Sequence, residues 1–440
     1  MKDRIGIIGG GLVGALLSIL LVKRGFRVEV FEKRSDPRKG LNPEGRSINL
    51  ALSHRGIRAL KLADVFQHVE PMLIPMYGRM IHTEMETAFH SYGRSDQFIN
   101  SVSRHQLNTI LIDFAEKSGA SYHFDQVIQG TDASTGVIKL PSGTSHQFDF
   151  IIGADGAFSE LRKTIGQLNA TYSTTEDILS HGYKELNIPP KNGEFALDPH
   201  ALHIWPRKDY MLIALPNNDK SFTCTLFLAN EGPISFSQLT SSHQIQKFLE
   251  DSFPDAVKLL PDPIDQFQKN PTSSLQNIKT YPWTFRKSLL IGDAAHAIVP
   301  FYGQGMNAGF EDCRILIELL ESTGLNWEKS VNQFQVERKK DTDAIAELAL
   351  KNFLEMRNDV IDEDFLKRKR LEGRLYEAFP NEWLPLYSMV TFSDIPYHKA
   401  LETGILQMKA IQSLEADYDP EEVNLKELLK HFKKLSQAAY

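Results

Sequence analysis

Cysteine is scarce in this chain, and its scarcity excludes two classes of structure. Only Cys224 and Cys313 occur among 440 residues, far apart in the sequence. Two such residues cannot build a disulfide framework or a thiolate metal cluster, and a reducing compartment is expected. The 14 histidines show no metal-ligand spacing of the His-Glu-x-x-His kind. The sequence therefore predicts no metal site and a cytoplasmic location.

The chain also lacks an excess of basic residues and long apolar runs. Lys and Arg number 49 against 56 Asp and Glu, which gives a net charge of −7. Nucleic acid is not an expected partner, because binding to phosphates requires a basic surface. The stretch 5–22 has no charged residue, but several glycines interrupt it and Lys23-Arg24-Gly25 follows. A buried strand and a buried helix explain it better than a signal peptide or membrane span.

What is present is the pattern of an ordinary globular protein with two or three structural units. Strand and helix patterns alternate near the N-terminus and return at residue 288, which favours an α/β fold with a Rossmann-like domain. From about 173 to 280, apolar residues alternate as in an antiparallel sheet. We expect a discontinuous cofactor-binding domain at 1–70, 101–172 and 281–375, an inserted antiparallel-sheet substrate domain at 71–100 and 173–280, and a C-terminal helical region at 376–440.

A glycine motif lies inside a predicted strand-helix-strand unit at residues 4–31. Gly9 permits the tight turn, Gly11 lets the backbone approach a pyrophosphate, and Gly14 lets helix and strand pack closely. Glu32, at the end of the second strand, fits ribose hydroxyls and disfavours a 2′-phosphate. The unit predicts a site for FAD or NAD rather than NADP.

A second motif, at 288–307, combines an apolar strand, an acidic residue and a glycine-rich loop that opens a helix. A helix N-terminus presents free N–H groups and partial positive charge, and Asp293 can accept hydrogen bonds from sugar hydroxyls. These features suit a polyol chain and a ring that becomes anionic on reduction, which describes a flavin. A third motif contains Asp155-Gly156, which by itself is equally compatible with a plain turn.

Together the three motifs resemble those of flavoprotein aromatic hydroxylases of the p-hydroxybenzoate hydroxylase-like class, which implies FAD as the cofactor. The resemblance implies that Asp155 lies near the pyrophosphate and the docking site of an external nicotinamide, and that Asp293 binds the ribityl chain. The helix that opens near Gly305 would point at the flavin carbonyl edge. The expected cofactor-binding residues are Gly9, Gly11, Leu12, Val13, Gly14, Glu32, Lys33, Arg46, Arg104, Asp155, Asp293, Pro300, Gly303, Gly305, Met306 and Asn307.

Segments at 46–56, 299–313, 352–358 and 385–397 resemble the kynurenine 3-monooxygenase family, and the similarity extends along nearly the whole chain. The resemblance implies hydroxylation of L-kynurenine to 3-hydroxykynurenine through a C4a-hydroperoxyflavin, with NADPH and O2 as co-substrates. The amino group already activates the arene, so we expect no catalytic protein base and a structural role for His296.

The family binds the amino-acid head of its substrate with one arginine, two tyrosines and one asparagine. Arg79, Tyr92, Tyr387 and Asn352 stand at the matching positions, and a planar guanidinium can bind a carboxylate through two parallel hydrogen bonds. Without the family match, Arg79 would be interpreted as a surface arginine over a strand. The expected neighbours of the substrate ring are Leu215, Phe227, Phe301 and Tyr302.

Two other functions stay open at this point. One is a related flavin hydroxylase that acts on another aryl amino acid or a phenolic acid. The other is a non-catalytic escort protein with a flavoprotein fold, which the intact motifs at Asp155 and Asp293 disfavour. The predicted last helix, 421–439, is amphipathic; it could lie on a membrane surface or pack on the protein body. Eukaryotic members of the family carry a longer hydrophobic C-terminal anchor, which this chain lacks, so no transmembrane anchor is expected.

Overall fold

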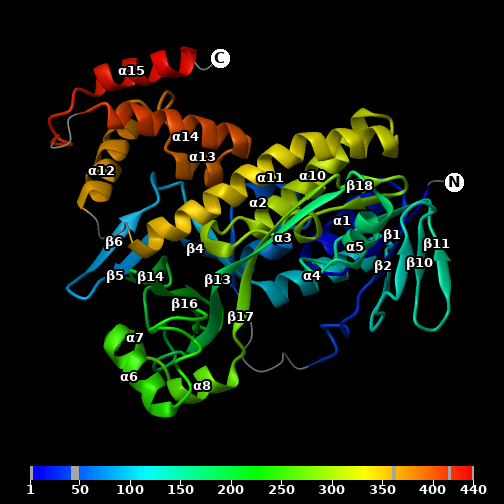
Figure 1. The fold of residues 1–440 in the computed structure, drawn as a ribbon, viewed down its shortest axis with the longest axis horizontal. Helices are drawn as coiled ribbons and strands as arrows, with labels where there is room; N and C mark the ends of the chain where they lie inside the picture. The colour runs from blue at the N-terminus through cyan, green and yellow to red at the C-terminus, as the bar shows by residue number, and fades with distance from the viewer. Residues whose placement is uncertain (1–2, 41–48, 359–362, 415–417, 439–440) are drawn as a thin grey trace.

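The computed structural model describes residues 3–40, 49–358, 363–414 and 418–438. A six-stranded sheet forms the centre of the first unit, in the order β18-β19-β12-β1-β2-β8 (Figure 1). All its neighbouring strands run parallel except the β18–β19 pair. Its strands are β1 (Arg4–Ile8), β2 (Arg27–Phe31), β8 (Ser121–His123), β12 (Phe150–Gly153), β18 (Thr284–Phe285) and β19 (Ser288–Leu290).

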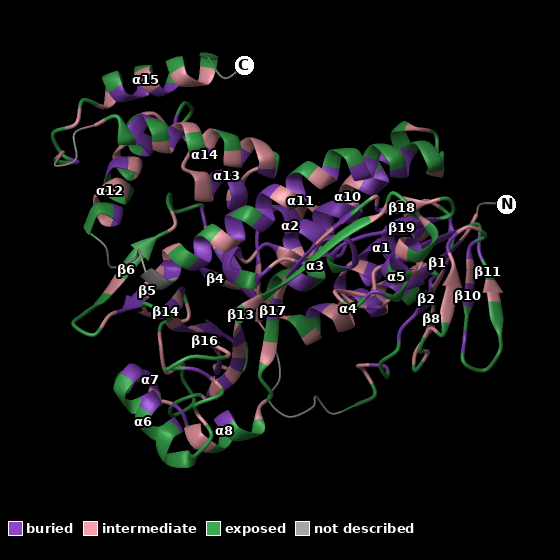
Figure 2. Ribbon diagram, viewed as in Figure 1, coloured by how far each residue is buried: buried purple, intermediate pink, exposed green. Residues whose placement is uncertain are grey.

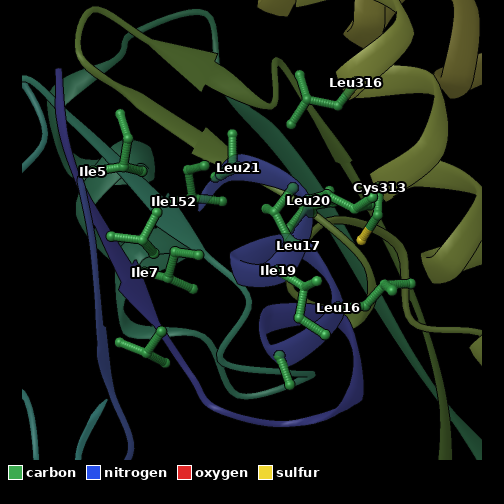
Figure 3. Packing of buried hydrophobic residues seen from close by; sticks show 14 of the residues in the cluster. Ile5, Ile7, Leu16, Leu17, Ile19, Leu20, Leu21, Ile152, Cys313 and Leu316 are labelled. Atoms are coloured by element: carbon green, nitrogen blue, oxygen red, sulfur yellow. The ribbon is translucent and has the colours of Figure 1, made fainter. Parts of the chain in front are cut away.

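Helix α1 (Leu12–Lys23) explains the uncharged N-terminal stretch. It is apolar on all sides, because it packs against the sheet and also against α4 (Arg104–Ser118) and α10 (Gly305–Ser322). Figure 3 shows leucines of α1 between the isoleucines of β1 and β12 and residues of α10. A helix buried all round has no polar stripe, so the stretch belongs to the core, as predicted.

The second unit contains a seven-stranded sheet in the order β17-β13-β16-β15-β14-β5-β6. Its neighbours are antiparallel except for β14 and β5, whose parallel register places Leu202 opposite Arg79. The strands are β5 (Gly78–His82), β6 (Thr87–Ser91), β13 (Ser173–Ile188), β14 (Ala201–Arg207), β15 (Tyr210–Pro216), β16 (Phe222–Ala229) and β17 (Ser273–Tyr281).

Three short helices pack on this sheet within the region that we expected to be strands and turns. Their apolar residues share one core with Trp205 and Phe222 of the sheet. A capping box at Ser241 and Gln244, in which each side chain bonds the other's backbone, begins the first of them. This local signal was available in the sequence. The helices are α6 (Ser242–Ser252), α7 (Pro254–Val257) and α8 (Pro263–Lys269).

Smaller elements connect the two units. A three-stranded sheet β3-β7-β4 lies between them, and a second one, β11-β10-β9, flanks the six-stranded sheet. The domain boundaries given above stay a prediction, and β4, inside the 71–100 segment, pairs with β7. The elements are β3 (Asn49–Leu52), β4 (Ile74–Met76), β7 (Ile99–Ser103), β9 (Gly130–Asp132), β10 (Val137–Lys139), β11 (Ser145–Gln147), α2 (His54–Leu62), α3 (Phe66–Val69), α5 (Glu160–Leu168), α9 (Asp293–His296), and 3-10 turns at Glu70–Met72 and Pro300–Tyr302.

The C-terminal part is helical, as predicted, and its last helices lie on the side of β5 and β6, away from the six-stranded sheet (Figure 1). It comprises α11 (Trp327–Asn358), α12 (Glu363–Ala378), α13 (Leu386–Phe392), α14 (Tyr397–Gln412) and α15 (Leu425–Ala438). The apolar face of α15, with Leu428, Leu429 and Phe432, is buried against α12 and α14 (Figure 2). It therefore packs on the body in this structure. Within the described ranges, no helix combines the length and apolarity needed to span a membrane.

Candidate active site

The glycine motif forms a tight turn after β1. Gly9 adopts φ +100°, and a Cβ on Gly14 would lie 2.0 Å from the carbonyl oxygen of Gly9. Gly11 is the N-cap of α1, and no side chain among the described residues caps that helix. The first turn, with Leu12 and Val13, therefore leaves backbone N–H groups available for an anion such as a pyrophosphate.

Glu32 is buried directly after β2 and lies against this turn. One carboxylate oxygen accepts the Gly10 N–H at 2.8 Å, and the other accepts the Arg34 backbone N–H and Nε, both at 2.9 Å. Burial acts to raise the pKa of Glu32, but the bonds from Arg34 and Gly10 hold it below its ordinary value. Lys33, the predicted cofactor contact, and Arg34 are both exposed, and sequence reasoning missed the bonds of Arg34 to Glu32. The carboxylate is charged at neutral pH and suits sugar hydroxyls.

The other two motifs touch the first one, because β12 lies next to β1 and β19 lies next to β12. A Cβ on Gly9 would meet the Ala154 carbonyl oxygen at 2.4 Å, and one on Gly292 would meet Val13 at 3.1 Å. One oxygen of Asp155 accepts the Glu160 N–H at 2.8 Å, whereas its buried Oδ1 has no hydrogen-bond partner among the described residues. Burial raises the pKa of Asp155. A ligand hydroxyl that donates to this buried oxygen would satisfy it.

The loop before α10 closes the other side of this site. Pro300 is exposed, Gly303 adopts φ +66°, and Gly305 begins α10, which no side chain caps within the described ranges. Asn307 is buried, and its side chain bonds the backbone of Ser53, Ala51 and Gly303. Asn307 therefore shapes the loop from behind. Met306 is half-buried, Asp293 is exposed at the start of α9, Arg104 is exposed at the start of α4, and Arg46 lies outside the described residues.

These features fit FAD. Two helix N-termini have no side-chain cap, the Glu32 carboxylate suits sugar hydroxyls, and Asp155 has a carboxylate oxygen without a hydrogen-bond partner among the described residues.

We expect Gly14→Ala to weaken FAD binding about tenfold, because overpacking of about 1–3 kcal/mol displaces the turn. Titration of the apoprotein with FAD measures this effect. Gly373→Ala is the matched control, since a Cβ there meets nothing within 4 Å; equal FAD affinity in the two variants would contradict the assignment.

Three of the predicted head-group residues come together between the sheet and the C-terminal helices. The Arg79 guanidinium carbon lies 5.1 Å from the Tyr387 ring centroid and 5.7 Å from that of Tyr92. The two tyrosine rings stack at 5.1 Å, and Tyr302 stacks on Tyr387 at 5.5 Å. An arginine near the start of β5 thus lies beside aromatic rings that come from separate segments.

Charge and burial make this cluster suitable for an anion. Burial acts to lower the pKa of Arg79, but Tyr387, Tyr92 and Glu355 raise it above its ordinary value, so the guanidinium stays charged. Burial raises the pKa of Tyr92, Tyr302 and Tyr387, which keeps the phenols neutral. The Arg79 Nε and the Tyr92 hydroxyl are buried without a hydrogen-bond partner among the described residues. Buried unpaired donors are costly, so a ligand that accepts from both would be stabilised here.

The other residues predicted to bind the substrate lie outside this cluster, in two places. Phe301 stacks on Phe353 at 4.0 Å and contacts the Phe227 ring at 4.9 Å. The Asn352 amide donates to the Phe301 carbonyl at 2.6 Å, so Asn352 holds the loop that carries Phe301. Leu215 is buried in a separate small cluster beside Tyr92. Phe227 and Phe301 therefore lie against each other, whereas Leu215 packs with Tyr92.

A buried ionic network behind the flavin motif was not found from the sequence. The Arg338 Nε donates to Asp312 at 2.8 Å and its Nη1 donates to Glu311 at 2.9 Å. Asp312 also bonds His296 at 2.5 Å and accepts the Gly292 N–H at 3.2 Å. His296 thus has a structural partner, and no group of three or more His, Cys, Asp or Glu in the described ranges could hold a metal.

The chain was compared with known proteins. The FAD binding domain family matches residues 3–339. Kynurenine 3-monooxygenase of Cytophaga hutchinsonii is 46% identical over 97% of this chain and 98% of its own length. The enzyme of the same name from Flavobacterium johnsoniae is 46% identical over 92% of each chain. Crystalline 2-methyl-3-hydroxypyridine-5-carboxylic acid oxygenase, at 20% identity, shares the fold with a TM-score of 0.68 over 84% of this chain and 96% of its own.

The matched relatives cover nearly the whole chain, and the matched fold confirms the α/β class with an FAD-binding unit and a C-terminal helical region. An escort protein without flavin is not favoured by these relatives. The roles of the individual site residues in binding stay predictions. The chain belongs to the kynurenine 3-monooxygenase family of FAD binding domain proteins.

Proposed function

We propose that this protein is an FAD-dependent monooxygenase that uses NADPH and O2 to hydroxylate L-kynurenine to 3-hydroxykynurenine. Two supports are independent: the family to which the chain belongs, and the half-buried, charged Arg79, whose buried Nε and the neighbouring Tyr92 hydroxyl have no hydrogen-bond partner among the described residues. The second observation carries the substrate assignment, because an α-amino acid offers a carboxylate that can accept from Arg79 and Tyr92.

For the cofactor, we propose that the turn at Gly9, Gly11, Leu12, Val13 and Gly14 binds the pyrophosphate through its N–H groups. Glu32 would bind the ribose next to the adenine, and Asp155 and Asp293 would accept hydrogen bonds from hydroxyls of the cofactor. The α10 N-terminus at Gly303, Gly305 and Met306 would stabilise negative charge on the reduced ring. When bound, FAD supplies hydride acceptance from NADPH and activation of O2.

The residues of the chain position the substrate and exclude water. Arg79 holds the carboxylate, and Tyr92 and Tyr387 close over it. Phe227, Phe301 and Tyr302 would contact the aromatic ring and orient the carbon next to the amino group toward the cofactor. These aromatic residues are buried, so they keep water from the reacting atoms. No proton acceptor is required on the protein, because the arylamine already activates the ring.

The partners implied by this proposal are L-kynurenine, NADPH and O2, and we propose a cytoplasmic location. Both cysteines are free and buried. Burial raises the pKa of Cys224 to about 12, so its thiol is protonated and unreactive at neutral pH. A chain with free thiols and no disulfide is suited to a reducing compartment.

The function is tested by NADPH oxidation with the FAD-loaded protein, with and without L-kynurenine. We expect fast oxidation only with kynurenine, and a product heavier by one oxygen in mass spectrometry. Fast oxidation that yields only hydrogen peroxide would identify kynurenine as an effector and favour another aryl amino acid or phenolic acid as substrate. No response despite bound flavin would refute the substrate assignment and leave the cofactor unaffected.

A further inference from the structure

Arg55 of α2 is almost completely buried, with 1% of its side chain exposed, and it contacts three segments distant in sequence. Its Nε donates to the Val390 carbonyl at 3.2 Å, and its Nη2 donates to the Ile395 carbonyl. Its Nη1 donates to Glu311 at 2.6 Å. One guanidinium thus joins the flavin-binding unit to α13 and to the segment between α13 and α14.

Tyr397, the first residue of α14, adds a second connection at the same place. Its ring is fully buried, and the Arg55 guanidinium carbon lies 3.9 Å from the ring centroid. The Tyr397 hydroxyl donates to Gln304 at 2.9 Å, and Gln304 directly precedes the first residue of α10. The arginine and the tyrosine therefore bind α13, α14 and the flavin loop to one another.

The position of α13 matters because it carries Tyr387. The helix has only seven residues, too few to be stable alone, and its last carbonyl groups need partners. Val390, whose carbonyl Arg55 binds, lies three residues after Tyr387, about one helical turn. At the other end of that turn, Tyr387 faces Arg79 and stacks on Tyr92 and Tyr302.

We propose that Arg55, together with Tyr397, is a positioning residue that fixes α13 so that Tyr387 closes over the substrate carboxylate held by Arg79. This role rests on the proposed function. Lysine cannot replace it, because a single ammonium lacks the planar fork that here serves three acceptors while stacking on a ring. The pair acts on substrate binding and leaves the dinucleotide turn unaffected.

The test uses FAD-loaded Arg55→Lys and follows L-kynurenine binding through the flavin absorption spectrum. We expect a dissociation constant raised at least tenfold at unchanged FAD content, with a larger share of NADPH oxidation ending in hydrogen peroxide. Arg58→Lys is the matched control. Arg58 lies one turn away from Arg55 on α2, is 41% exposed and pairs with Asp394, in the segment between α13 and α14. Its affinity should stay within twofold of the native value.

A double-mutant cycle separates positioning from general destabilisation. If Arg55 acts through Tyr387, Arg55→Lys should change kynurenine affinity less than threefold in a Tyr387→Ala background. An equal tenfold loss in both backgrounds, or native affinity in the single variant, would overturn the proposal. If Arg55→Lys does not retain FAD, Tyr397→Phe takes its place in the double-mutant cycle with Tyr387→Ala. The same comparison of kynurenine affinity in the two backgrounds then tests the proposal. If kynurenine does not change the flavin spectrum of the native protein, the proposed function itself is refuted.

Discussion

Replacing Arg79 with alanine should weaken L-kynurenine binding about 30-fold to several thousand-fold while FAD binding stays native. Removing one partner of a buried, hydrogen-bonded charge pair costs about 2–5 kcal/mol, and each 1.4 kcal/mol is a factor of about ten. Arg79 lies beside the stacked rings of Tyr92 and Tyr387, and its Nε is buried, so water replaces its contact with the carboxylate poorly. Kynurenine titration of the FAD-loaded variant, followed by flavin absorption, measures the loss.

Two variants make the Arg79 prediction specific. Arg79→Lys keeps the charge but loses the bidentate geometry, so its affinity should lie between those of the native protein and the alanine variant. Arg94→Ala removes a nearby arginine that is 56% exposed and pairs with Asp96, and it should have little effect. Turnover of kynurenine by Arg79→Ala at native efficiency would contradict the role assigned to Arg79.

Replacing Arg338 with alanine should cost the protein about 3–5 kcal/mol of stability, the range for breaking a buried ion pair. The change leaves Glu311 paired with Arg55 and the partly exposed Arg314, whereas Asp312 and Asp341 each keep only a histidine, His296 and His398, as a described ionic partner. Burial acts to raise the pKa of Asp312, while His296 and Arg338 hold it below its ordinary value. Loss of Arg338 therefore removes one of the two groups that hold the pKa of Asp312 down.

Denaturant unfolding of the FAD-free protein measures the Arg338 effect without contribution from the ligand. Lys269→Ala, which breaks an exposed pair with Asp265, is the control and should change stability by less than about 1 kcal/mol. FAD affinity should fall as well, because Asp312 accepts the Gly292 N–H of the flavin motif. Native stability in Arg338→Ala would show that water or a rearranged partner compensates the network.

Local patterns made the first unit predictable. The strand, helix and strand of residues 4–31 were predicted correctly, because apolar periodicity and glycine spacing act within a few residues. Ser103, a residue type that favours N-caps, accepts the Gln106 N–H at the start of α4. The last helix begins at Leu425, four residues after the predicted start, because Asn424 accepts the Glu427 N–H there.

The site was predicted less completely from the residues themselves. Arg79 alone resembles a surface arginine; only the family resemblance selected it. The network of Arg55, Glu311, Asp312 and Arg338 was missed, because charged residues in a helix are usually solvated and nothing in their own segments indicates burial. Asn307 and Asn352 were selected as ligand contacts, and the structure shows their amides bonded to the backbone of loops that carry such contacts.

The sequence by itself determined the dinucleotide turn, the flavin motif and the family, since each depends on residues close together in the chain. Tertiary structure alone decided how Arg79, Tyr92 and Tyr387 meet and how Arg55 reaches Ile395, 340 positions away. The physical reason is the range of the interactions. Turns, caps and periodic burial act over a few residues, whereas ring stacking and buried ion pairs form only after packing has brought distant segments into contact.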